Sequence, residues 1–370
     1  MAKTTQTLIP QAAAIDVCGC SLSKIEKGYN GSTTPIAAAS LTHMLNPTAK
    51  VIAPEWGPIR ATPDDQCGFG TRITQASPVL DKYEFKWSPK FRMNAENAAW
   101  LLALALGKVT TAALQTDKGY VHTIEPFVGS DAPATGTGGY ELLPSTALYF
   151  LLTDPVAYAA GEIIAKGIYI NSITVTAKPG AFAEIDVEFI GSGETADGSS
   201  VSTLTIPTVN QLWLAKFEMG TADSEVDMTL AIEEVSWKWS NDVQEDAARA
   251  GGFSGYRTQA LRGDYKYELS FKLKESLNQE IMSLWAANTV QKAILTFEGA
   301  AIASTSPTVY NSAIINCYAG TLQSPKVDVT GPYKNIAPTW VPKADGSDNY
   351  CDVTVNVGTG GPATLLVQES

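Results

Sequence analysis

The stretch "KYEFKWSPKF", residues 82–91, decides the fold, because charged and aromatic side chains alternate in it with a period of two. Such alternation is typical of a β-strand that buries one face and shows the other to water. The stretch "YKYELSFKLK", residues 265–274, has the same pattern. The sequence therefore predicts two half-buried strands of one kind. Their predicted inward positions are Tyr83, Phe85 and Trp87 in the first strand and Tyr267, Leu269 and Phe271 in the second.

The resemblance between these strands extends upstream of them. Segments that begin at Gly68 and Gly252 align without a gap at an offset of 184, which is close to half of the 370 residues. Self-similarity at one fixed offset indicates that a structural unit is present twice. The residues Gly68, Phe69, Thr74, Gln75, Ala76, Lys82, Tyr83 and Glu84 match Gly252, Phe253, Thr258, Gln259, Ala260, Lys266, Tyr267 and Glu268.

A helix is predicted after each of the two strands. Asn94 can cap the run "AENAAWLLALAL" before Gly107 ends it, and Ser276 with Gln279 forms a capping-box pattern before "EIMSLWAAN". Trp100 and Trp285 fall at similar places in the two helices, and we interpret both as core residues that pack against a sheet.

A long hairpin is predicted over residues 167–191, with its turn at Pro179 and Gly180. Alternate residues of its second strand stand side by side on one face, so its carboxylates form a row. Such a row is open to three interpretations: a solvated face, an acid/base pair, or the lining of a channel. The predicted inward residues are Ile185, Val187 and Phe189, and the predicted outward row is Glu184, Asp186 and Glu188.

These segments predict a mainly β protein of two tandem, structurally similar β-sandwich or barrel domains, each with one flanking α-helix. The first domain is expected over residues 1–205, with an inserted Gly/Ala/Thr-rich loop around 114–146, and the second over residues 206–370. The sequence lacks the regular alternation of strands and helices that would indicate a parallel sheet.

Charge and composition restrict the classes of function. Charged residues make up 17% of the chain, below the roughly 25% of ordinary soluble domains, and the formal net charge is −12. The low charge favours a surface that other subunits cover, although a Ser/Thr/Gly-rich β protein without partners would look the same. The acidic balance and the lack of a basic stripe argue against binding DNA by charge. The start of the sequence has no secretory pattern, and we expect a soluble protein made in the cytoplasm.

No catalytic constellation or cofactor motif is recognisable. His43 and His122 are the two histidines, and we expect packing or surface roles for both. Cys18 and Cys20 lack further ligands at zinc-site spacing, and the five cysteines do not form a disulfide framework. The sequence thus predicts no enzyme, no cofactor and no metal site.

The order of these features resembles the tail tube (major tail) proteins of tailed bacteriophages: a Tyr/Phe-rich strand, a Trp-containing helix, a long loop and a Gly-bounded hairpin. The resemblance covers most of the chain, and the duplication is its strongest part. It implies β-sandwiches whose extended hairpins join those of neighbours into a barrel around a lumen, with rings stacked head to tail.

Single-domain members of this family form hexameric rings, so a two-domain chain is expected to form a trimer with pseudo-sixfold symmetry. The implied function is a virion conduit with an acidic lumen through which DNA passes without specific binding. The implied partners are other copies of the chain and the terminator, tip and tape measure proteins, with no membrane. Glu184, Asp186, Glu188 and Asp352 are the candidate lumen or rim residues, and the loop near residues 129–140 is expected to reach the next ring.

Two other classes share the same sequence features. One is a different shell component, such as a capsid decoration or surface-layer protein. The other is a carbohydrate-binding or hydrolytic β-sandwich, for which the eight tryptophans offer stacking surfaces.

Overall fold

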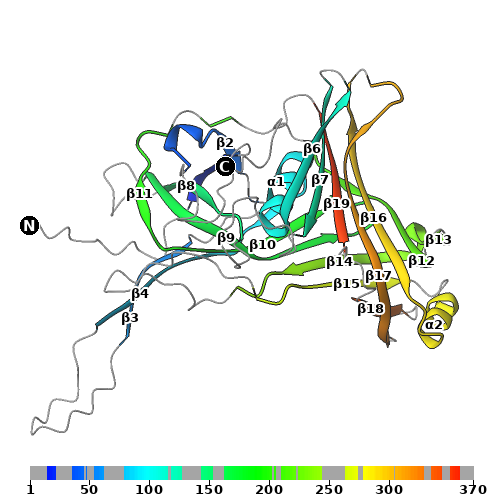
Figure 1. The fold of residues 1–370 in the computed structure, drawn as a ribbon. Helices are drawn as coiled ribbons and strands as arrows, with labels where there is room; N and C mark the ends of the chain where they lie inside the picture. The colour runs from blue at the N-terminus through cyan, green and yellow to red at the C-terminus, as the bar shows by residue number, and fades with distance from the viewer. Residues whose placement is uncertain are drawn as a thin grey trace, which may run out of the picture.

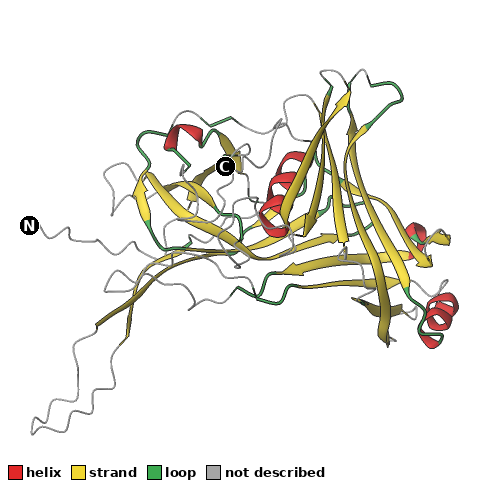
Figure 2. Ribbon diagram, in the orientation of Figure 1, coloured by secondary structure: helices red, strands yellow, loops and turns green. Residues whose placement is uncertain are grey.

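The chain folds as a mainly β protein in which strands of both halves join into one continuous antiparallel sheet (Figures 1 and 2). The computed structural model describes residues 15–21, 36–45, 47, 54–61, 79–115, 118–126, 143–152, 162–201, 204–205, 210–221, 224–243, 263–273, 278–303, 305–328, 335–343 and 351–358. The predicted mainly β class is confirmed.

The first half contains eight strands that pair in the order β2-β1-β8-β9-β10-β4-β3, with β11 beside the first part of β9. The strands are β1 (Ile15–Cys20), β2 (His43–Leu45), β3 (Glu55–Ala61), β4 (Val79–Trp87), β8 (Thr146–Leu152), β9 (Glu162–Ala177), β10 (Glu184–Gly191) and β11 (Thr195–Asp197).

The second half contains eight strands that pair in the order β13-β12-β16-β17-β18-β15-β14, with β19 beside the first part of β17. The strands are β12 (Trp213–Thr221), β13 (Ser224–Asp227), β14 (Ile232–Ser240), β15 (Lys266–Leu273), β16 (Gln291–Ala301), β17 (Tyr310–Asp328), β18 (Asn335–Pro342) and β19 (Cys351–Gly358).

The two strand orders are the same, strand for strand. Taken along the chain, β1, β2, β3 and β4 correspond to β12, β13, β14 and β15, and β8 to β11 correspond to β16 to β19. Each half has one long strand, β9 or β17, which pairs with different neighbours along its length. The strands that contain the two opening sequence stretches, β4 and β15, occupy equivalent places. An origin by gene duplication and the predicted boundary at residues 205 and 206 stay predictions.

The first half contains one insertion between its equivalent strands. After β4 come β5 (Lys90–Arg92), α1 (Ala95–Leu106), β6 (Gly107–Gln115) and β7 (Gly119–Pro126), whereas β15 is followed by α2 (Asn278–Ala286) alone. Part of the loop expected around residues 114–146 is therefore a strand: β7 pairs with β6 on one side and with β19 on the other. Residues 127–142 lie outside the described residues.

Eight strands form a continuous layer that we call the base layer. Its order is β3-β4-β10-β9-β14-β15-β18-β17, in which β9 and β17 contribute their C-terminal parts. The short strand β5 pairs with β10 of this layer. The other strands form two smaller sheets above the base layer, and α1 lies between them (Figure 1). The core fills the space between these layers. Buried base-layer residues include Phe85, Trp87, Ile185, Val187, Phe189, Trp237, Trp239, Leu269, Phe271 and Trp340.

Helix α1 forms as its sequence predicts. The Asn94 side chain accepts a hydrogen bond from the Asn97 backbone nitrogen, and the Asn97 side chain accepts one from the Asn94 backbone. This capping box starts the helix. Gly107 ends it with φ of 101°, a left-handed conformation that glycine adopts without a steric penalty. For α2, Ser276 lies outside the described residues.

The prediction that Trp100 and Trp285 are both core residues is half wrong. Trp100 is fully buried, whereas 41% of Trp285 is exposed. The reason is position: α1 is covered by strands of both halves, but α2 lies at the far end of the second half (Figure 1).

Candidate functional site: two open strand edges and a polar sheet face

The two halves join in the base layer through β9 and β14, and in one of the upper sheets through β7 and β19. The register of β9 and β14 runs from Ala177 opposite Val235 to Ser172 opposite Ser240, an antiparallel pairing of six residue pairs. The edge of β9 that binds β14 is the one that pairs with β8 further back, where Thr146 lies opposite Ile168. One edge of β9 therefore pairs first with β8 of its own half and then with β14 of the other half.

A buried asparagine fixes this junction. The Asn241 side-chain nitrogen donates hydrogen bonds of 2.9 Å to the carbonyl oxygens of Ala105 in α1 and Ile170 in β9. Its side-chain oxygen accepts a 2.9 Å hydrogen bond from the Trp239 indole nitrogen. Asn241 is fully buried, so these bonds satisfy polar groups that water cannot reach. One side chain thus links the helix and long strand of the first half to the second half.

The equivalents of β9 and β14 are open at the two ends of the base layer. By strand order, β14 corresponds to β3, and the β14-binding part of β9 corresponds to residues 324–328 of β17. Within the described residues, β3 pairs with β4 alone, and residues 324–328 pair only with β18. The two segments lie at opposite ends of the molecule, β3 at the lower left and β17 at the lower right (Figure 1).

Unpaired strand edges present rows of backbone donors and acceptors, which another strand can satisfy. The structure contains one junction of this type, between β9 and β14. It also contains the two segments that could form a second such junction, β3 and residues 324–328 of β17. The two segments cannot meet within one chain because they lie at opposite ends. A second copy could bring its β3 beside β17 of the first.

The base layer shows its polar side chains on the face away from the core. The predicted alternation in β10 is correct: Ile185, Val187 and Phe189 are buried, and Glu184 and Asp186 face outward. The Lys90 ammonium group lies 3.3 Å from a Glu184 carboxylate oxygen and 3.4 Å from an Asp186 oxygen. These carboxylates raise the pKa of Lys90 against a lowering by desolvation.

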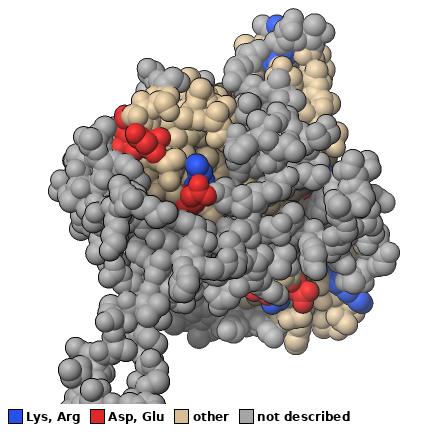
Figure 3. All heavy atoms as spheres, turned by 60° about the vertical axis from the view of Figure 1, so that its left-hand side comes forward, with Lys and Arg blue, Asp and Glu red and all other residues tan. Residues whose placement is uncertain are grey.

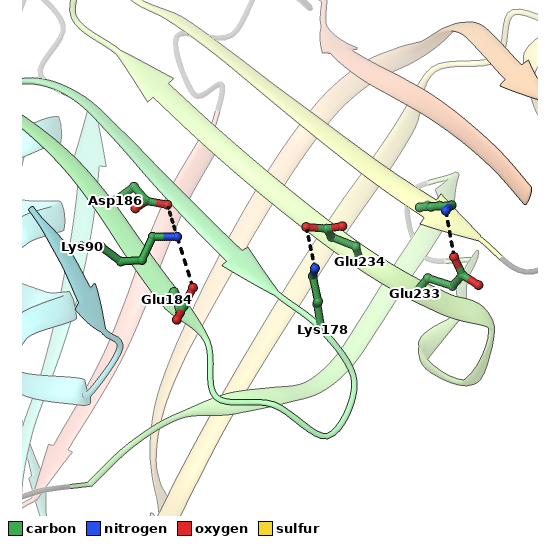
Figure 4. Close-up of polar contacts among 7 residues, drawn as sticks. Lys90, Lys178, Glu184, Asp186, Glu233 and Glu234 are labelled. Carbon is green, nitrogen blue, oxygen red and sulfur yellow. Dashed lines mark hydrogen bonds and ion pairs between the residues drawn. The ribbon is translucent and has the colours of Figure 1, made fainter. Parts of the chain in front are cut away.

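Ion pairs continue across the junction on this layer. Lys178, in the turn between β9 and β10, lies 3.5 Å from Glu234 of β14, and Lys272 of β15 lies 3.3 Å from Glu233. Figure 4 shows these pairs one after another across β5, β10, β14 and β15. All of these side chains are substantially exposed, so each pair contributes little to stability.

The third carboxylate of the predicted row, Glu188, is held without a lysine. Its Oε2 atom accepts hydrogen bonds from the Asn171 side-chain nitrogen at 2.9 Å and from the Ser172 hydroxyl at 3.0 Å. All three candidate carboxylates thus lie together on one sheet face, each with a polar partner.

The base-layer face is mixed in charge rather than acidic. Lys86, Lys238, Lys266 and Lys272 stand among its carboxylates, with serines and threonines between them. Where Figure 3 shows described residues, the charged ones appear as small separate groups. The described carboxylates of this face are thus accompanied by lysines, and the acidic lumen stays a prediction.

Asp352 does not belong to this face. It lies on β19, in one of the two upper sheets, where its carboxylate accepts a 2.7 Å hydrogen bond from the Tyr318 hydroxyl. Burial and Asp352 raise the pKa of Tyr318. Of the predicted core positions, Phe69 and Phe253 lie outside the described residues, and the side chain of Tyr83 is likewise not described.

The two histidines and the four described cysteines occupy packing positions, and Cys67 lies outside the described residues. His122 is fully buried on β7, its Nδ1 atom lies 2.9 Å from the Thr111 hydroxyl, and burial lowers its pKa to about 4. His43 is half-buried, and burial lowers its pKa as well. Cys18 and Cys20 are buried free thiols whose pKa values burial raises, so they are poor nucleophiles at neutral pH.

Most described tryptophans serve the core. Trp87, Trp100, Trp237, Trp239 and Trp340 are buried, and Trp213 and Trp285 are exposed. The buried five cannot stack on a sugar, which removes most of the surface that a carbohydrate-binding interpretation would use.

Two contributors to the junction have no local signal in the sequence. Asn241 sits in a polar stretch, "SNDV", that reads as the end of a strand. The pairing of β7 with β19 joins residues more than 200 positions apart in the sequence. The one hint in the sequence is the position of Asn241 directly after a Trp-rich segment, where an amide side chain can become buried.

Comparisons with known proteins give no family. The chain matches none of the known protein families and none of the curated proteins. Among the described residues, no helix has the length and apolar character needed to cross a membrane.

Proposed function

We propose that this chain is a self-assembling structural protein whose copies join head to tail into a ring, and that stacked rings form a bacteriophage tail tube. The observation that carries the proposal is the β9–β14 junction inside the chain, together with the two open edges that correspond to it. Repeating that junction between chains places β17 of one copy beside β3 of the next.

Head-to-tail contacts close into a ring when the rotation between units divides a full turn. The rotation from the first half to the second half would be repeated at each contact between chains. Three chains would then give six units in pseudo-sixfold symmetry, as the resemblance implies. With eight base-layer strands per chain, about 24 strands spaced about 4.8 Å apart and tilted by about 40° make a wall about 50 Å across.

The lining of this ring would be the polar face of the base layer. A wall about 50 Å across, less its lining side chains, leaves a channel wider than a DNA double helix. Paired charges and hydroxyl groups offer few free cations to phosphates, and the net charge of −12 adds weak repulsion. DNA would pass through such a channel without specific binding. The proposal keeps the conduit but not a strongly acidic wall.

The tail tube function also specifies partners and place. Rings would stack on one another and end against terminator and tip proteins, with a tape measure protein inside during assembly. The protein would be assembled in the host cytoplasm and would belong to the virion. No enzymatic activity, cofactor or metal is part of the proposal.

Electron microscopy of the purified full-length protein tests the proposal. We expect rings or tubes with a central channel and class averages with three-fold symmetry and six similar lobes. Isolated knobs or flat sheets would favour a capsid decoration or surface-layer protein, and particles that stay monomeric at high concentration would contradict assembly altogether.

A further inference from the structure

The second helix marks a surface that the proposed assembly has to cover. Helix α2 is amphipathic: Ile281 is buried and Met282 and Leu284 pack partly against the core, whereas Trp285 is 41% exposed. Val290, between α2 and β16, is also 41% exposed. Val226 on β13 is 50% exposed and Leu230 in the 3-10 turn η2 (Thr229–Ala231) is 95% exposed. All of these elements lie at the right-hand end of the molecule (Figure 1).

This end is unusually apolar for an exposed surface. Eight large hydrophobic residues are exposed among the described residues. Four of them lie at this end: Trp285 in α2, Val290 between α2 and β16, Val226 in β13 and Leu230 in η2. Scattered single hydrophobic residues need no explanation, but a group at one end of a molecule indicates a contact surface.

Helix α1 shows what covers the equivalent place in the first half. It packs against its own long strand β9, against β6 and β7 of the insertion, and against β17 and β19 of the second half. Its tryptophan, Trp100, is fully buried there. Helix α2 packs against its own long strand, β17, in the same way, but within the described residues no other strand covers it to a similar extent.

The strand correspondence identifies the missing cover. Because β9 corresponds to β17 and β11 corresponds to β19, the equivalents of the two second-half strands that cover α1 are β9 and β11, whereas β6 and β7 have no equivalent. In this chain β11 lies at the far left of Figure 1, opposite to α2. Ala196 on β11 packs, partly buried, on a small apolar cluster that includes Ile164 of β9.

We infer that α2 docks against β9 and β11 of the next copy of the chain and that Trp285 becomes buried there, as Trp100 is buried within the chain. This inference deepens the proposed function and rests on it. It adds a side-chain contact, α2 on β9 and β11, to the backbone pairing of β17 with β3.

Hydroxyl-radical footprinting with mass spectrometry tests the inference directly. We expect oxidation of Trp285 to be several-fold slower in the assembled protein than in the monomer, and oxidation of Trp100 to be slow in both. Rings in which Trp285 is oxidised as fast as in the monomer would overturn the inference and leave the proposed ring intact. A wild-type protein that forms no rings would overturn both.

A pair of matched variants separates docking from folding. Trp285→Asp is expected to abolish rings while the monomer keeps its circular dichroism spectrum and melting temperature, and Trp285→Phe is expected to restore assembly. Trp213→Asp is the control, because Trp213 is 44% exposed but lies opposite Glu298 on β16, away from Gln291, where the chain enters β16 from α2. Rings formed by Trp285→Asp, or an equal loss with Trp213→Asp, would overturn the inference.

Discussion

The two helices of this chain have similar sequence surroundings but differ in how far they are buried. Helix α1 follows β4 and is sealed between the two halves, and α2 follows the equivalent strand β15 and keeps a tryptophan in solvent. The difference is that α1 is covered by β6 and β7 of the insertion and by β17 and β19 of the second half, whereas within the described residues only β17 covers α2 to a similar extent. The β9–β14 junction within the chain therefore shows which contacts are missing at the end of the molecule where α2 lies.

The largest expected effect of a single change is at the β9–β14 junction. Trp239 is fully buried, and its ring stacks 5.0 Å from that of Tyr265 and 5.8 Å from that of Tyr267. Trp239→Ala is expected to lower the free energy of unfolding by about 3–5 kcal/mol, because it leaves a large cavity.

Denaturant unfolding of the monomer measures this loss, and Trp285→Ala in α2 is the matched control. The control should cost well under half as much, because Trp285 is partly exposed in the monomer. If Trp239→Ala and Trp285→Ala lowered the free energy of unfolding equally, the two tryptophans would not differ in burial as described.

The next effect concerns the polar link of the same junction. Asn241→Leu removes hydrogen bonds to two carbonyl oxygens and to the Trp239 indole, and the three partners stay buried. We expect a loss of about 2–3 kcal/mol, since buried groups left unpaired carry their desolvation cost. Asn171→Ala is a useful comparison, because the side chain of Asn171 is only partly buried and bonds to Glu188 and to the Val243 backbone. A loss at Asn241 no larger than at Asn171 would remove Asn241 from its central place.

The inserted hairpin, which only the first half has, should make stability depend on pH. The pKa of His122 is about 4 in the folded protein against 6.5 ordinarily, so the unfolded chain takes up the proton first. Stability is full above pH 6.5 and falls as the pH drops from 6.5 to 4, by up to about 1.4 kcal/mol per pH unit.

Unfolding of wild type and His122→Gln over this pH range measures the contribution of His122. The variant should show a smaller slope, and His43→Gln, at a less buried histidine, should change the slope less. Parallel curves for wild type and His122→Gln would contradict the buried, neutral state of His122.

The smallest effect is expected on the polar face. Lys90→Met removes the ion pairs to Glu184 and Asp186, which are exposed and separated by 3.3 and 3.4 Å. The free energy of unfolding should change by under about 1 kcal/mol, and ring formation should persist. Thermal melting and microscopy of the variant check both points, and a loss of rings would assign Lys90 to assembly rather than to the lining.

Local patterns were sufficient for the parts of the fold that neighbours in sequence determine. Alternation placed the inward residues of β10 and β15 correctly, and Asn94 and Gly107 gave both ends of α1. The turn at Pro179 and Gly180 separates β9 from β10 as predicted. The carboxylate row was also placed on one face, because period-two spacing fixes that geometry.

The parts that failed depend on contacts between distant segments. Lys90 on β5 pairs with Glu184 and Asp186 of the row, and no spacing rule in the sequence links these residues. The local sequence predicts a loop where β7 forms, because the pairing partner of β7, β19, lies more than 200 residues away. The burial of Trp100 and exposure of Trp285 cannot be read from two similar helices, since each depends on what packs beside it.

A density map of the assembled protein that resolves individual strands tests the central claim most directly. The account predicts that β3 of each copy lies antiparallel beside residues 324–328 of β17 in the preceding copy, in the geometry that β14 and β9 have within one chain. A ring in which these two edges face solvent, or in which other segments join the copies, would contradict it.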